Sequence, residues 1–190
     1  VLPETEGVAG MRVLELRHRA DISRGEALDL DPLLPLLDCV ADMQIVYGLD
    51  NNIAQKQIWR TDARTGETKY IDLPGGGGRR GHIDSQNRLW FSQFHANKYA
   101  RYDAKTRNVT AWDVPVPFAG AYDVQYDDVK YAWGADMSTD LVQRLNTETG
   151  EWDSYLLPTS INPRHVDVQK NPNGLSSMWS EGQQSSQIVH

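Results

Sequence analysis

The chain has 190 residues, and its 19 Lys and Arg stand against 26 Asp and Glu, which gives a formal net charge of −7. This acidic balance excludes a nucleic-acid clamp, because such proteins present a basic surface. The longest apolar cluster, residues 33–40, is interrupted by Pro35 and Asp38, so no bilayer-spanning run of about 20 apolar residues exists. The single cysteine, Cys39, excludes an internal disulfide and a cysteine-based metal site.

The first 40 residues stand apart from the rest. Residues 11–17 and 26–31 alternate apolar and polar side chains and predict a hairpin. Residues 31–41 then predict a short helix with Asp31 as its N-cap. We interpret residues 1–40 as a hairpin and short helix that form part of a blade. The sequence starts without Met and ends in a strand-like run at 187–190, so we expect it to be part of a longer protein.

An internal repeat is the main signal in the remaining sequence. Residues 58–74, 99–115 and 142–158 align with one another, and corresponding positions lie 41 and 43 residues apart. Each segment has an Arg, then an Asp or Asn two residues later, and a Pro at its close. These residues are Arg60, Arg101 and Arg144; Asp62, Asp103 and Asn146; and Pro74, Pro115 and Pro158.

Two further patterns precede these segments. One places an aromatic residue every 43 to 46 residues, at Tyr47, Trp90, Trp133 and Trp179, and we expect these side chains to pack between blades. The other opens each unit with a polar-rich strand, at 80–84, 121–125 and 164–168.

Each unit is predicted to hold four short antiparallel strands. In the third unit we place them near 121–126, 130–135, 141–146 and 152–157. Four strands in about 42 residues is typical of a propeller blade. The Asp-x-x-Thr-Gly segments between the outer strands are interpreted as hairpin turns, despite a faint likeness to calcium loops. The predicted fold is therefore an all-β propeller of four-stranded antiparallel blades.

The blades are predicted at 41–78, 79–118, 119–160 and, incomplete, 161–190. A closed propeller has about 4 to 8 blades. The chain is therefore either an arc of a larger ring, or missing blades come from the rest of the parent chain. Gly75–Gly78 between two blades lacks the Gly-Lys-Ser/Thr of a phosphate loop, so we interpret it as a flexible connection.

The repeat resembles that of the virginiamycin B lyase (streptogramin lyase) family across residues 41–190. The shared pattern is Pro-x-x-Val/Ile, an Asn/Gly-Leu-Trp-Phe strand, Arg-x-Asp-x-x-Thr-Gly, and an apolar-Pro close. The resemblance implies a seven-bladed ring in a bacterial protein, and it leaves open whether the compartment is extracytoplasmic or cytoplasmic. It also implies a lyase that opens a cyclic ester by elimination, with Mg²⁺ bound.

The family pairs a His at the start of a blade's first strand with a Glu at the end of the second. Here the His positions hold Arg80, Tyr122 and Arg164, and the Glu positions hold Gln93, Asp136 and Glu181. His165 follows one place late and makes His165 with Glu181 the best catalytic candidate. Asp136 is the metal candidate, and a hairpin-turn Asp is the competing interpretation.

Further polar side chains are expected to face the central channel, where a small-molecule ligand would bind. The candidates for substrate binding are Arg80, His82, Gln93, His95, Tyr122, Asp123 and Arg164, and Asp84 and Asp167 share the same faces. For His82 and His165 the alternative is an ordinary strand histidine with its hydrogen bonds satisfied.

Three hypotheses remain open. The first is a metal-assisted lyase acting on a cyclic ester or other small molecule at the channel mouth. The second is a non-catalytic propeller that binds a ligand or a protein. Because Arg80 and Arg164 stand where the family has His, that ligand would be anionic. The third is a structural module within a multidomain protein.

Overall fold

The structure is a computed structural model that describes residues 45–51, 54, 56–183 and 188–190. The hairpin and short helix predicted for residues 1–40 lie outside the described residues. Within the described ranges no helix is long and apolar enough to cross a membrane.

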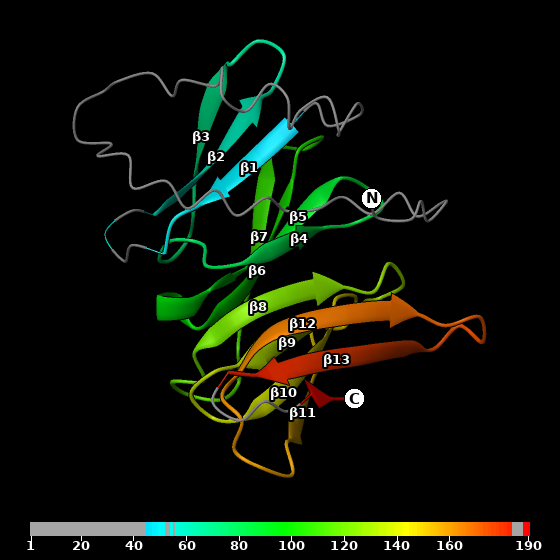
Figure 1. Cartoon of the computed structure of the whole chain (residues 1–190). Helices are drawn as coiled ribbons and strands as arrows, with labels where there is room; N and C mark the ends of the chain where they lie inside the picture. Colours follow the sequence, from blue (N-terminus) through cyan, green and yellow to red (C-terminus); the bar gives the residue numbers. More distant parts are fainter. Residues whose placement is uncertain (1–44, 52–53, 55, 184–187) are drawn as a thin grey trace, which may run out of the picture.

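Four antiparallel sheets follow one another along the chain (Figure 1). The first holds β1 (Ile45–Leu49), β2 (Gln57–Asp62) and β3 (Thr68–Asp72). The second holds β4 (Gly81–Ile83), β5 (Arg88–Gln93), β6 (Lys98–Asp103) and β7 (Asn108–Asp113), with a 3₁₀ turn, η4 (Phe94–Ala96), between β5 and β6. The third holds β8 (Ala121–Tyr126), β9 (Tyr131–Asp136), β10 (Leu141–Asn146) and β11 (Trp152–Leu156), and the fourth holds β12 (Pro163–Lys170), β13 (Ser176–Gly182) and β14 (Ile188–Val189).

Strands within each sheet pair in chain order, so every sheet is a simple meander. Among the first strands of the last three sheets, β8 contacts both β4 and β12. This is the arrangement of propeller blades, whose first strands line the centre. The prediction of an all-β propeller is confirmed. The four sheets do not close into a ring; in Figure 1 the first lies at the top, and the third and fourth overlap in the lower half.

The hairpin turns between the outer strands are built by the repeated Asp and Asn. In one turn Asp103 Oδ1 accepts the backbone N–H groups of Lys105 and Thr106, at 2.8 and 3.3 Å. Asp62 and Asn146 accept the same pair of bonds in their own turns. The side chains thus satisfy the turn backbone, as the hairpin interpretation predicted.

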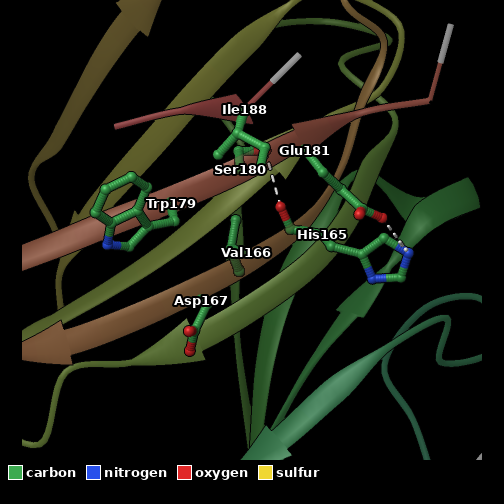
Figure 2. Close-up of a pocket in the computed structure, with 7 residues that line it drawn as sticks. All are labelled: His165, Val166, Asp167, Trp179, Ser180, Glu181 and Ile188. Carbon is green, nitrogen blue, oxygen red and sulfur yellow. Dashed lines mark hydrogen bonds and ion pairs between the residues drawn. The ribbon is translucent and has the colours of Figure 1, made fainter. Parts of the chain in front are cut away.

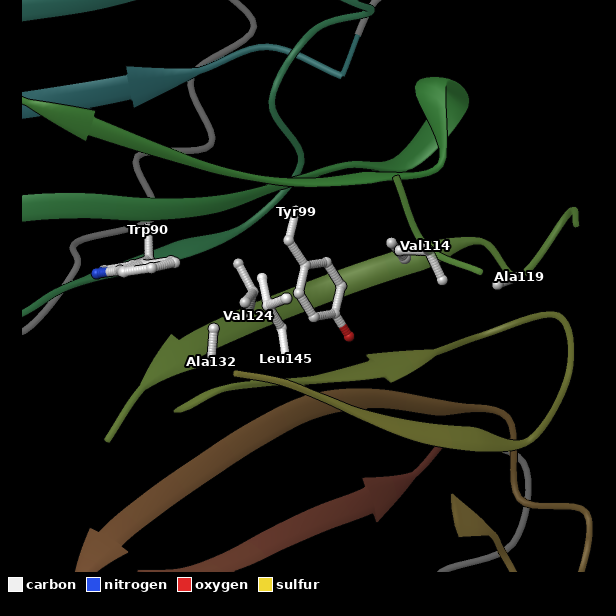
Figure 3. Close-up of a cluster of buried hydrophobic side chains, with 8 residues drawn as sticks. Trp90, Tyr99, Val114, Ala119, Val124, Ala132 and Leu145 are labelled. Atoms are coloured by element: carbon white, nitrogen blue, oxygen red, sulfur yellow. The ribbon is translucent and has the colours of Figure 1, made fainter. Parts of the chain in front are cut away.

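The largest buried cluster lies between the second and third sheets (Figure 3). Trp90 of β5 is fully buried and stacks on Tyr126 with the ring centroids 4.8 Å apart. The expectation for the aromatic pattern is wrong at Trp179, which is 40% exposed. Its sheet face is not covered by another sheet among the described residues, and it stacks only on the His190 ring, 4.1 Å away.

The glycine-rich connection between the first two blades is packed rather than loose. Gly76, Gly77 and Gly78 are buried, and Gln93 Nε2 donates a 2.6 Å hydrogen bond to the Gly76 carbonyl. A run without side chains allows the backbone to pass this close to its neighbours. The interpretation of this segment as flexible does not match the structure.

Gly134 of β9 allows the second and third blades to approach each other. A Cβ atom at this position would lie 2.1 Å from the hydroxyl of Tyr99, which is fully buried. We expect Gly134→Ala to lower the free energy of unfolding by about 1–3 kcal/mol through overpacking. Urea denaturation followed by tryptophan fluorescence measures this. In a Tyr99→Leu background the extra cost of Gly134→Ala should fall to that of the remaining close approach to the Asp123 backbone oxygen, 2.6 Å away; an unchanged cost would show that the clash with Tyr99 is not the cause.

Candidate functional site

The start of each central strand carries the same irregularity. The register between β8 and β9 shifts between Ala121 and Asp123, which leaves Tyr122 as a bulge. The β12–β13 register shifts between Pro163 and His165, which leaves Arg164 as a bulge. A β-bulge turns its side chain away from the regular alternation, and bulges are frequent next to functional sites.

The second blade shows the same pattern just before β4. Arg79 N donates to Ser92 O at 2.8 Å, and Ser92 N donates to Arg80 O at 2.9 Å. Arg79 and Arg80 therefore both lie opposite Ser92, which is the pattern of a β-bulge. The positions at which the resemblance places the family's His, Arg80, Tyr122 and Arg164, are equivalent in backbone geometry as well as in sequence.

These side chains converge on Tyr122. Arg79 Nη2 donates a 2.7 Å hydrogen bond to the Tyr122 hydroxyl, and the Arg79 guanidinium carbon lies 4.4 Å from the ring centroid. The guanidinium carbons of Arg164 and Arg80 lie 5.4 and 5.9 Å from the same centroid. Burial raises the pKa of Tyr122, but the hydrogen bond from Arg79 and the charges of Arg79 and Arg164 outweigh it, so its pKa lies below the usual 10.0.

Asp123 joins the three central strands. Its carboxylate is 1% exposed and faces His82 Nε2 of β4 at 3.1 and 3.2 Å. It also accepts the backbone N–H of Val166 in β12 at 3.2 Å, and its Oδ2 lies 3.9 Å from His165 Nδ1. Burial lowers the pKa of His82, but the Asp123 hydrogen bond and charge, with that of Asp167, outweigh this and raise it above the usual 6.5.

His165 and Glu181 face each other across β12 and β13 (Figure 2). The two residues are direct register partners, and His165 Nε2 lies 3.2 Å from Glu181 Oε1. The side chain of His165 is 34% exposed and that of Glu181 is 60% exposed, so solvent reaches the pair. Both line a hollow of about 340 Å³ that also contacts Trp179 and Ile188.

Other predicted site residues lie elsewhere. Gln93 is fully buried, and its amide bonds to the glycine-rich connection. His95 is exposed on η4 and packs edge-on against Phe94, with the ring centroids 5.1 Å apart. Asp84 is buried in the turn after β4, where it binds Arg88 and Trp90. The contacts of these residues stabilise the second blade and its connections rather than the cluster around Tyr122.

The metal candidate Asp136 does not fit a magnesium site. It is fully buried at the end of β9, and its Oδ2 accepts a 2.7 Å hydrogen bond from Gln143 Nε2. Burial raises its pKa from 3.8 to about 7, so the carboxyl group holds a proton close to neutral pH. Among the described residues no three His, Cys, Asp or Glu side chains gather into a metal-binding group. Magnesium prefers charged oxygen ligands with room for water, which this buried position lacks.

Sequence reasoning missed Arg79. The Arg79-Arg80 pair follows the glycine run, and only Arg80 coincides with the repeat. A bulge places two adjacent residues opposite one, which is why the preceding arginine also reaches Tyr122. The two adjacent arginines in the sequence were the feature from which Arg79 could have been predicted as a site residue.

Known proteins share the fold of this chain. No known family profile matches the sequence, and no curated protein is similar to it in sequence. Among solved structures, one titled streptogramin B lyase has a TM-score of 0.62 at 19% identity, covering 75% of this chain and 49% of that chain. The chain is a β-propeller segment.

Two further structures are similar at the same level. Virginiamycin B lyase from Staphylococcus aureus has a TM-score of 0.56 at 16% identity, over 72% of this chain and 48% of that one. An auxiliary nutrient binding protein from Bacteroides ovatus has a TM-score of 0.52 at 13% identity, over 72% of this chain and 39% of that one. The segment thus spans half or less of the length of these propellers. At such identities the likeness establishes the fold alone.

Proposed function

We propose that this segment belongs to a propeller that binds a small molecule at the starts of β4, β8 and β12 and eliminates a leaving group from it. His165 is the general base, and Glu181 orients it. The supporting observation is the 3.2 Å contact between His165 Nε2 and Glu181 Oε1 beside a solvent-reached hollow. The similarity to streptogramin B lyase favours a cyclic ester as the substrate.

The chemistry follows from the chain's own groups. The His165 imidazole takes a proton from the carbon next to the one that carries the ester oxygen. The electron pair of that C–H bond forms the alkene, the C–O bond breaks, and the carboxylate leaves with the charge. No water is consumed, and His165 returns its proton to solvent. Asp136 does not fit a magnesium ion, and no step of this chemistry depends on one.

The test is ring opening of virginiamycin B by the purified chain, followed by mass spectrometry of the product, with Mg²⁺ and with EDTA. We expect His165→Ala to lower the rate at least about 100-fold, the lower range for loss of a general base. His95→Ala removes an exposed histidine outside the cluster and should keep the full rate. If the unchanged chain opens no ring under either condition, the catalytic proposal is wrong.

A second candidate is a binding propeller without catalysis. Both histidines already face carboxylates, since Asp123 contacts His82 at 3.1 Å and His165 at 3.9 Å. Such contacts favour histidine rings that are held in place to line a binding site over a histidine that takes a proton from a substrate. The similarity to a nutrient binding protein is consistent with this candidate. Ligand binding without product would support it.

A further inference from the structure

Three guanidinium groups lie around one buried aromatic ring. The guanidinium carbons of Arg79, Arg164 and Arg80 are 4.4, 5.4 and 5.9 Å from the centroid of Tyr122, whose side chain is 6% exposed. Arg79 and Arg80 come from the chain just before β4, whereas Tyr122 lies in β8 and Arg164 in β12, so tertiary structure rather than local sequence gathers them. Gathering like charges costs free energy unless something of opposite charge is present.

Two of these arginines, Arg79 and Arg164, lack a carboxylate partner among the described residues, although the whole chain carries a net charge of −7. Arg164 Nε donates instead to the neutral Asn162 Oδ1 at 2.9 Å. Elsewhere in the chain arginines do pair, as Arg144 does with Asp153.

Tyr122 adds a donor to these groups. Its hydroxyl oxygen accepts the 2.7 Å hydrogen bond from Arg79 Nη2, so its own proton remains available for another acceptor. The depressed pKa of Tyr122 makes that O–H a stronger donor. Guanidinium groups bind carboxylate and phosphate oxygens through paired hydrogen bonds. Arg79, Arg164 and Tyr122 therefore offer hydrogen-bond donors, and the acceptors that the two arginines meet within the described residues are neutral.

We propose that Arg79, Arg164, Arg80 and Tyr122 form a site for an oxyanion, either a carboxylate or a phosphate group on a small molecule. This inference rests on the proposed function in placing the ligand at the same central strand ends, and it adds that the ligand or product is anionic. The T-shaped contact between Tyr122 and His165, with centroids 6.1 Å apart, sets the oxyanion next to His165. A carboxylate that leaves during elimination would be held there.

Isothermal titration calorimetry of the full chain with inorganic phosphate and, separately, with citrate tests the proposal. Ionic strength is held constant with chloride. We expect saturable binding of one of the two anions, weakened at least tenfold in the Arg79→Gln/Arg164→Gln variant. Citrate binding alone identifies a carboxylate site, and phosphate binding alone identifies a phosphate site. Arg64→Gln removes an exposed arginine from a distant turn and should leave the affinity unchanged.

The remaining variants separate binding from folding. Tyr122→Phe keeps the ring beneath the guanidinium groups but lacks the hydroxyl, and we expect a smaller, few-fold loss. Thermal melting of each variant reports its fold; Arg79→Lys/Arg164→Lys, which keeps the charge, should retain more affinity than the Gln pair. Absence of binding by the unchanged chain, or equal binding by the Gln pair, overturns the anion site. Neither result affects the ring-opening assay, which depends on His165.

Discussion

Asp84→Ala is expected to lower the free energy of unfolding by about 3–5 kcal/mol, which is the cost of removing one partner from a buried ion pair. Asp84 is 7% exposed and accepts hydrogen bonds from Arg88 Nε at 2.6 Å and from Trp90 Nε1 at 2.9 Å. It also accepts the backbone N–H groups of Gln86 and Arg88. Without the carboxylate, the guanidinium and the indole N–H lose their acceptor in a poorly hydrated place. Chemical denaturation measures the change.

The equivalent turn in the next blade supplies the control. Asp127 Oδ1 accepts three backbone N–H groups, from Val129, Lys130 and Tyr131, and its Oδ2 accepts the Ser176 hydroxyl. All four donors are neutral, so we expect Asp127→Ala to cost less, about 1–3 kcal/mol. Asp84→Asn, which keeps an acceptor, should fall between the two. A larger loss at Asp127 than at Asp84 would contradict the role assigned to the ion pair.

The repeat in the sequence was sufficient to predict the blades. The repeat spacing of 41 and 43 residues, with a turn-forming Asp or Asn in each unit, predicts the positions of the turns in the outer hairpins of the blades. In the third blade the predicted strands agree with β8 to β11 to within one residue at each end. Local turn chemistry and apolar alternation carry this information, because both are properties of a few adjacent residues.

The candidate site was only partly visible in the sequence. Alignment with the family's motif paired His165 with Glu181, which the structure places in register at 3.2 Å. It could not show that Asp123 bridges to His82, because that contact joins different blades. The burial of Asp136 was also invisible, since a polar residue at a strand end has the same pattern whether a neighbouring sheet covers it or not. Such features depend on how whole sheets stack.

The buried Asp136 should make the stability of the protein fall as pH rises. Burial raises its pKa from 3.8 to about 7, while a hydrogen bond from Gln143 offsets only part of the effect. Between these two values the folded protein holds a proton that the unfolded chain has released. The stability contribution is therefore full below pH about 4 and is lost as the pH rises to about 7 and above, by about 4 kcal/mol in all. Urea denaturation at pH 4, 5.5, 7 and 8 measures the slope.

Asp136→Asn isolates this effect because an amide cannot ionise. Its Oδ1 can accept the Gln143 Nε2 bond that Asp136 Oδ2 accepts at 2.7 Å, since Gln143 is itself held in orientation by Ser154. We expect the variant to match the parent near pH 4 and to be more stable by about 2–4 kcal/mol at pH 8.

The control is Asp72→Asn, which changes an exposed carboxylate bonded to Gln57 and should leave the pH dependence of the parent's stability intact. His82, whose raised pKa also favours the folded state at lower pH, remains in both proteins and leaves a smaller residual slope above pH 6.5. If Asp136→Asn loses stability at pH 8, the buried carboxyl group is ionised and compensated there, and the assignment of its proton is wrong.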